Sequence, residues 1–224
     1  MLACPQCGSA LRSAVPGLPV VTCASCDAMV LIENGALEHV GDSGRMPFDV
    51  SPLQIGTTLL VDGTRGEIVG RERWAWERGS WNEWLLQLPG ADHRWVAEEA
   101  GYLMVMAPIA PRADVRKRLG AMRRLGRAAL GNTVKVEKVG YTVADIKTVR
   151  CIASEGHLPH IVPPAQERHS IDLRSRSGAV LTFQEDANDS GCWVGTYRTL
   201  TQLQPRDLRQ LDGWPAPKFA AATA

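Results

Sequence analysis

Short runs of alternating apolar and polar residues, separated by turn residues, fill most of the chain after residue 53. A period of two is typical of strands with one buried face, and strands at this spacing indicate an antiparallel barrel or sandwich. The first five expected strands are 58–61, 67–71, 83–88, 94–98 and 102–106. The pattern therefore predicts a mainly β protein.

The same pattern recurs later in the chain. The spacing Gly56-x-Thr58-x-x-Val61 returns 75 residues further on as Gly131-x-Thr133-x-x-Val136. Expected strands at 169–173, 179–186 and 192–197 then follow in the same order. We interpret the recurrence as a tandem duplication, which gives two small antiparallel β-barrel or sandwich modules at 53–110 and 131–204. Such modules would pack together to cover their edge strands.

One segment between the modules, 111–130, has a helical period. Val115, Leu119, Met122 and Ala129 trace one apolar face at helical spacing, which predicts a linker helix. The helix is basic: it carries Arg112 and six further Lys or Arg residues, and Asp114 is its one acidic residue. These six, the expected contacts to an anionic surface, are Arg116, Lys117, Arg118, Arg123, Arg124 and Arg127. An anionic membrane, nucleic acid phosphates or an acidic protein would fit them, and the alternative is a solvated linker.

Four cysteines near the start form a metal-binding pattern. Cys4, Cys7, Cys23 and Cys26 follow the spacing C-x2-C-x15-C-x2-C. Two such pairs aim four thiolates at one point, which predicts a tetrahedral Zn²⁺ site in a zinc ribbon at 1–40. A thioredoxin-like redox site would have a single pair beside a helix. Four thiolates leave no open position for a substrate, so the zinc is expected to be structural.

Composition limits the class of protein further. The 224 residues include 25 Lys and Arg against 24 Asp and Glu, a net charge of +1, which argues against a protein that coats nucleic acid with its whole surface. No apolar run approaches the roughly 20 residues of a transmembrane helix. No signal-peptide pattern precedes Cys4, so we expect a cytoplasmic protein with reduced thiols, in contact with the cytoplasmic face of a membrane at most.

Five of the seven tryptophans fall between Trp74 and Trp95. Trp84 and Trp95 are expected in the core of the first module. Trp74, Trp76 and Trp81 are expected in a loop, where exposed aromatic rings commonly mark recognition surfaces. With the carboxylates of Glu83, Glu98 and Glu99, the cluster would form a partner surface or a pocket for an organic cation.

The strand motifs also resemble a known family. Residues 81–86, WNEWLL, match a W-x-E-[WY]-x-L strand, and residues 95–101, WVAEEAG, match a W-[VL]-x-E-E-x-G strand. With the C-P-x-C-G knuckle at 4–8, they look like bacterial proteins of the domain of unknown function 4178 over most of residues 1–200. That family often neighbours polyamine-synthesis, small membrane and envelope-stress proteins. The resemblance implies an accessory role near the membrane and no catalytic residues.

These observations lead to one main hypothesis and two alternatives. The main hypothesis is a non-catalytic zinc-binding adaptor in which the ribbon and the exposed aromatic residues hold unidentified protein partners. The first alternative is a module that binds a polyamine-like cation through the Trp and Glu cluster, and the second is an enzyme acting on such a metabolite. The C-terminal tail, 205–224, is expected to be disordered from Trp214 onward.

Overall fold

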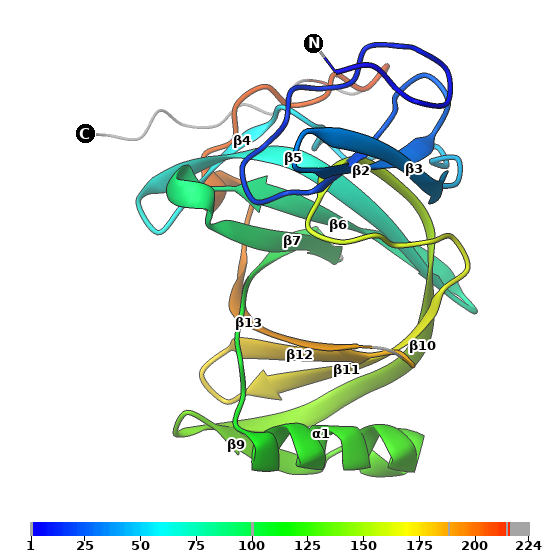
Figure 1. The fold of residues 1–224 in the computed structure, drawn as a ribbon. Helices are drawn as coiled ribbons and strands as arrows, with labels where there is room; N and C mark the ends of the chain where they lie inside the picture. The colour runs from blue at the N-terminus through cyan, green and yellow to red at the C-terminus, as the bar shows by residue number, and fades with distance from the viewer. Residues whose placement is uncertain (1, 100, 188, 214, 216–224) are drawn as a thin grey trace.

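The structure is a computed structural model that describes residues 2–99, 101–187, 189–213 and 215, without the side chain of Glu99. It is mainly β, with an N-terminal ribbon, one barrel and one α-helix (Figure 1). The fold class predicted from the sequence is confirmed at this level. The predicted disorder at Trp214 and 216–224 lies outside the described residues.

The ribbon consists of two cysteine knuckles and three short strands. These strands are β1 (Val20–Thr22), β2 (Ala28–Glu33) and β3 (Ala36–Asp42). Between the knuckles and before β1, the chain forms a single bridge between Val15 and Leu18, around the turn at Gly17. A cluster of apolar side chains around Val21 and Val30 fills the ribbon, but it is small.

Eight strands form a closed antiparallel barrel. Their order around the wall is β10-β11-β12-β13-β8-β7-β6-β5, and β5 pairs with β10 to close it. The strands are β5 (Thr64–Trp76), β6 (Gly79–Gln87), β7 (His93–Glu99), β8 (Tyr102–Pro108), β10 (Val139–Leu158), β11 (Glu167–Ser175), β12 (Ala179–Glu185) and β13 (Ser190–Arg198). Two short strands, β4 (Thr58–Val61) and β9 (Thr133–Val136), form hairpins with β5 and β10.

The two predicted β-modules are therefore the two halves of one barrel. Strands β4–β8 come from the first segment and β9–β13 from the second, and each half is a meander of the same order. The first and last barrel strand of one half pair with the corresponding strands of the other, β5 with β10 and β8 with β13. A half alone would expose two edges, and pairing between the halves removes all of them.

Apolar residues on the outer face of the wall are covered by the connecting segments. The helix α1 (Ala113–Leu125) buries Val115, Leu119 and Met122 in a cluster with Leu181 and Phe183 of β12. On the first half, β4 and the 3-10 turn η3 (Thr201–Leu203) cover a second cluster around Trp84. The helix continues into the 3-10 turn η2 (Gly126–Ala129), and η1 (Pro89–Ala91) links β6 to β7.

The ribbon is attached to the barrel by strand pairing. Val20 and Val21 of β1 pair with Leu158 and His157, beyond the part of β10 that pairs with β5. Gly70 of β5 packs closely against this end of β10. A Cβ on Gly70 would be 1.8 Å from the carbonyl oxygen of His157. The ribbon and α1 consequently lie on opposite sides of the barrel (Figure 1).

Candidate functional site

The cysteine knuckles have matching backbone geometry. The amide of Gly8 donates a hydrogen bond to the carbonyl of Cys4, and the amide of Asp27 does the same to Cys23. Gly8 has φ of +76° and Asp27 of +59°, so each knuckle closes through a left-handed residue. The equivalent turns aim both cysteine pairs at one point.

The four sulfur atoms lie within 4.8 Å of one another, as a metal site requires. The Sγ atoms of Cys4 and Cys26 are 3.8 Å apart, and so are those of Cys7 and Cys23. Hydrogen bonds from Ser9 lower the pKa of the Cys7 thiol to about 6, while burial and contacts with the other three sulfurs raise the pKa of Cys26 to about 12. The predicted ligand set is thus assembled as a candidate metal centre.

A second candidate site is the lumen of the barrel. A cavity of about 210 Å³ is lined by side chains from both halves of the wall. The lining consists of Trp76, Ser80, Trp81, Glu83, Ala97, Glu98, Met104, Lys147, Ser170, Asp172 and Thr182. These residues belong to seven of the eight strands, β13 being the exception, so the cavity lies inside the barrel.

Three carboxylates face this lumen with polar partners. Glu72 and Glu83 are direct cross-strand neighbours on β5 and β6, and Asp172 pairs with Thr182 on the opposite half. Each accepts a hydrogen bond: from Nε1 of Trp74 to Glu72 (2.9 Å), from Nε1 of Trp81 to Glu83 (3.0 Å), and from Oγ1 of Thr182 to Asp172 (2.8 Å). Within the described residues, no Lys or Arg forms an ion pair with Glu83 or Asp172.

The protonation of these groups follows from their burial. Burial raises the pKa of Glu83 to about 8, and the charge of Glu72 acts in the same direction against the hydrogen bond from Trp81. Burial likewise raises the pKa of Asp172, against the hydrogen bond from Thr182 and the positive charges of Arg174 and Lys147. At neutral pH, Glu83 holds a proton unless a cation lies beside it.

The lumen continues past a constriction into a second cavity. A narrow space of about 10 Å³, bordered by Glu72, Glu83 and Trp95, separates the first cavity from one of about 430 Å³. His160, from the loop after β10, borders both the narrow space and the cavity of about 430 Å³. Its Nε2 lies 3.2 Å from Oε1 of Glu72. The second cavity thus lies beside the loop after β10 and the adjoining ends of β12 and β13.

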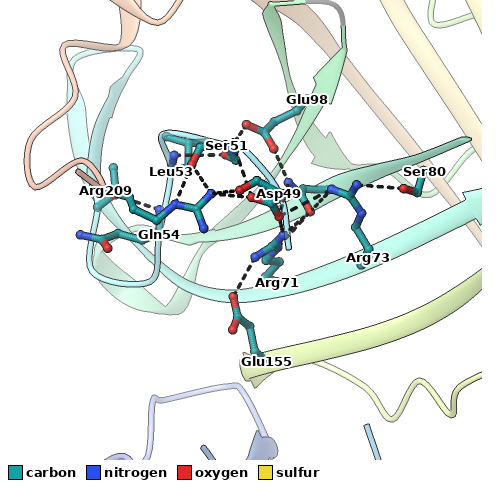
Figure 2. A network of polar contacts seen from close by, with 12 residues as sticks. Asp49, Ser51, Leu53, Gln54, Arg71, Arg73, Ser80, Glu98, Glu155 and Arg209 are labelled. Atoms are coloured by element: carbon teal, nitrogen blue, oxygen red, sulfur yellow. Dashed lines mark hydrogen bonds and ion pairs between the residues drawn. The ribbon is translucent and has the colours of Figure 1, made fainter. Parts of the chain in front are cut away.

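A separate polar network holds the chain segments outside the barrel. Asp49 contacts Arg71, Arg73 and Arg209, while Glu98 accepts hydrogen bonds from Ser51 and Asn82 (Figure 2). Side chains alternate along a strand, so Arg71 and Arg73 point away from the face that carries Glu72. The network ties the linker after the ribbon and the C-terminal segment to β5 and β6. We assign it a structural role.

The structure places the predicted aromatic cluster inside the barrel. Trp76 and Trp81 line the lumen with ring centroids 5.6 Å apart, and Trp74 is fully buried, so the three do not form an exposed loop. The loop prediction was wrong because β5 continues to Trp76 and β6 already begins at Gly79. Glu83 belongs to the lumen, as does Trp95, whereas Trp84 lies in the outer core.

Glu98 and Glu99 were predicted to belong to the same cluster as Glu83. Glu98 borders the cavity, but its carboxylate is held by Ser51 and Asn82. The side chain of Glu99 lies outside the described residues. Five of the six predicted basic residues are on α1 and Arg127 is on η2, on the side opposite the ribbon. Arg123 is ion-paired with Glu185.

Sequence reasoning missed Glu72, Lys147, Asp172 and His160. A signal was present on β11, where Arg168, Ser170, Asp172 and Arg174 alternate with apolar residues. Alternation alone does not say whether these polar positions face solvent or the interior. In a closed barrel whose outer face is covered by α1, they are the inner ones.

Most of the chain matches the model of a known protein family. The model of a family described as a domain of unknown function, DUF4178, matches residues 54–198. The chain belongs to the DUF4178 family. The match begins just before β4 and ends at the last residue of β13, so the DUF4178 domain is the barrel with α1, and the ribbon lies outside it. No curated protein and no solved structure matches the chain.

The helices in the described part of the chain are short. None is both long enough and apolar enough to cross a membrane.

Proposed function

We propose that the DUF4178 barrel binds a small organic cation in its lumen. The observation that carries the proposal is a pair of carboxylates, buried Glu83 and half-buried Asp172, which face a Trp-lined cavity. Neither forms an ion pair with a Lys or Arg among the described residues. Burying carboxylates is costly unless a proton or a cation neutralises them. A protonated amine would supply both the charge and the hydrogen-bond donors.

The aromatic rings suit the same class of ligand. A cation within about 6 Å of a Trp ring centroid is attracted by the electrons of the ring face. Nζ of Lys147 already lies 4.9 Å from the centroid of Trp76, beside Asp145. Trp81 and Glu83 would hold an ammonium group of the ligand in the same way, with Met104 against its apolar part.

Inward-facing rings favour ligand binding over the adaptor role. Trp76 and Trp81 are half-buried and Trp74 is buried, which leaves little aromatic surface for a protein partner. The adaptor hypothesis stays a prediction, as does the cytoplasmic location.

Calorimetric titration of the full chain tests the proposal. Spermidine and tetramethylammonium serve as cationic probes and 1-butanol as a neutral one. We expect heat from the cations alone, and release of a proton from Glu83 at pH 7, measured as a dependence on the ionisation enthalpy of the buffer. Glu83→Gln should abolish the proton release and weaken binding about tenfold or more, whereas exposed Glu67→Gln should change neither. Absence of heat at millimolar cation, or unchanged binding by Glu83→Gln, would contradict the proposal.

For the ribbon, we propose a structural zinc ion. A tetrahedron with Zn–S distances of about 2.3 Å has sulfur–sulfur edges of about 3.8 Å, which fits the two pairs. The small apolar cluster of the ribbon also argues that a metal contributes to its stability. Elemental analysis of freshly prepared, reduced protein should return one zinc per chain, and Cys23→Ser should lower that content. Another metal or none would overturn the assignment.

A further inference from the structure

One side of the molecule carries most of its positive charge. The segment 112–138, which spans α1, η2 and the turn between β9 and β10, contains nine Lys and Arg residues and two acidic ones. Its formal charge is +7 in a chain of net charge +1, so the remainder carries −6. This separation of charge would orient the molecule at an anionic surface.

The packing of α1 turns these cations to solvent. Because Val115, Leu119 and Met122 face the barrel, the basic positions of the helix lie on its outer side. Arg123 pairs with Glu185, and exposed Asp114 pairs with Arg112. The exposed cations, which we call the basic face, are Arg112, Arg116, Lys117, Arg118, Arg124, Arg127, Lys135 and Lys138.

Apolar side chains are exposed beside the basic face. Leu125 at the end of α1 is 56% exposed, Leu130 after η2 is 43% exposed, and Val139 at the start of β10 is 37% exposed. They are three of the six large apolar side chains that are exposed in the described part of the chain. Water disfavours such groups, whereas the boundary between lipid headgroups and acyl chains accepts them.

The residue types distinguish a bilayer from a nucleic acid. Residues 112–140 contain no Phe, Tyr or Trp, so this surface has no aromatic platform on which bases could stack. Leucine and valine among Lys and Arg are instead typical of segments that lie on anionic membranes. α1 is too short to span a bilayer, so contact would be restricted to the membrane surface.

We propose that the basic face docks on an anionic lipid bilayer. Lys117, Arg118 and Arg124 contact phosphate and carboxylate headgroups, and Leu125 and Leu130 enter the headgroup region. The ribbon, on the opposite side of the barrel, then faces away from the membrane (Figure 1). This docking is independent of ligand binding in the lumen.

Co-sedimentation of the full chain with vesicles tests the docking. The vesicles are pure phosphatidylcholine, or phosphatidylcholine with about 30% phosphatidylglycerol, in about 0.1 M salt. We expect binding only to the anionic vesicles. The triple variant Lys117→Gln, Arg118→Gln, Arg124→Gln should weaken it about a hundredfold, at about fivefold for each residue. Leu125→Ser with Leu130→Ser should lower the binding that persists at higher salt.

A matched triple variant controls for net charge. Arg12→Gln, Arg45→Gln and Arg206→Gln remove the same charge from exposed positions outside the segment 112–138 and should leave vesicle binding nearly unchanged. Equal losses in the two triple variants would overturn the proposal, as would a wild-type chain that ignores anionic vesicles. Tighter binding to a single-stranded RNA that displaces the vesicles would also overturn it, in favour of nucleic acid. Circular dichroism verifies that each variant is folded.

Discussion

The outer and inner faces of the barrel wall carry different chemistry on the same strands. On β12, Leu181 and Phe183 point outward into the cluster under α1, while Thr182 points into the lumen beside Asp172. On β6, Trp84 belongs to the outer core and Glu83 to the lumen. Apolar side chains also fill part of the interior, where Leu85, Trp95 and Met106 pack in one cluster with Leu18 and Val20 of the ribbon. The rest of the interior, around the cavity of about 210 Å³, holds carboxylates, indole groups and space, which are the properties of a binding site.

The largest expected difference between the two faces is in stability. Phe183→Ala should lower the free energy of unfolding by about 3–5 kcal/mol, because it leaves a cavity in the fully packed outer cluster. Its neighbour Thr182→Val, of similar volume, should cost only about 1 kcal/mol, since it removes one hydrogen bond to Asp172. Denaturant titrations of both variants measure this. Equal losses in the free energy of unfolding would contradict this difference between the two faces of β12.

A second difference concerns pH. The pKa of Glu83 rises from its ordinary value of 4.5 to about 8 on folding, so the folded state keeps a proton that the unfolded chain releases. Stability should consequently fall as pH rises from about 4.5 to 8, by on the order of 4 kcal/mol, and Asp172 acts in the same direction.

Glu83→Gln should remove most of that loss, so its advantage over the wild type grows with pH. Unfolding at pH 5, 6.5 and 8 measures the trend, with exposed Glu67→Gln as the control. Parallel curves for the wild type and Glu83→Gln would show that the lumen does not hold the proton.

The smallest expected difference is in tolerance of added volume. Ala129 is fully buried in the outer cluster, and Ala97 borders the cavity of about 210 Å³. Ala129→Leu should destabilise the protein by about 1–3 kcal/mol through overpacking. Ala97→Leu should change stability by less than about 1 kcal/mol and still block the cationic probes. A thermal shift assay and calorimetry compare them, and an Ala97→Leu variant that binds normally would place the ligand elsewhere.

Local features of this protein were predictable from the sequence. Cys4, Cys7, Cys23 and Cys26 set the knuckles through their spacing, because two residues between thiolates allow only a tight turn. The apolar period of Val115, Leu119 and Met122 located α1, and alternation located most strands. These elements follow from contacts between residues near one another in the chain.

The barrel and its lumen depended on the tertiary structure. Whether two similar halves form two modules or one barrel depends on β5 pairing with β10 and β8 with β13, over more than 70 residues of chain. No local pattern encodes such a pairing. Alternation marks two faces of a strand without saying which one is inside. The sequence therefore grouped Trp76 with Glu83, which lie close in the chain, but not with Asp172. Closure of the wall brought them together, because only a closed sheet turns one face of every strand toward a single axis.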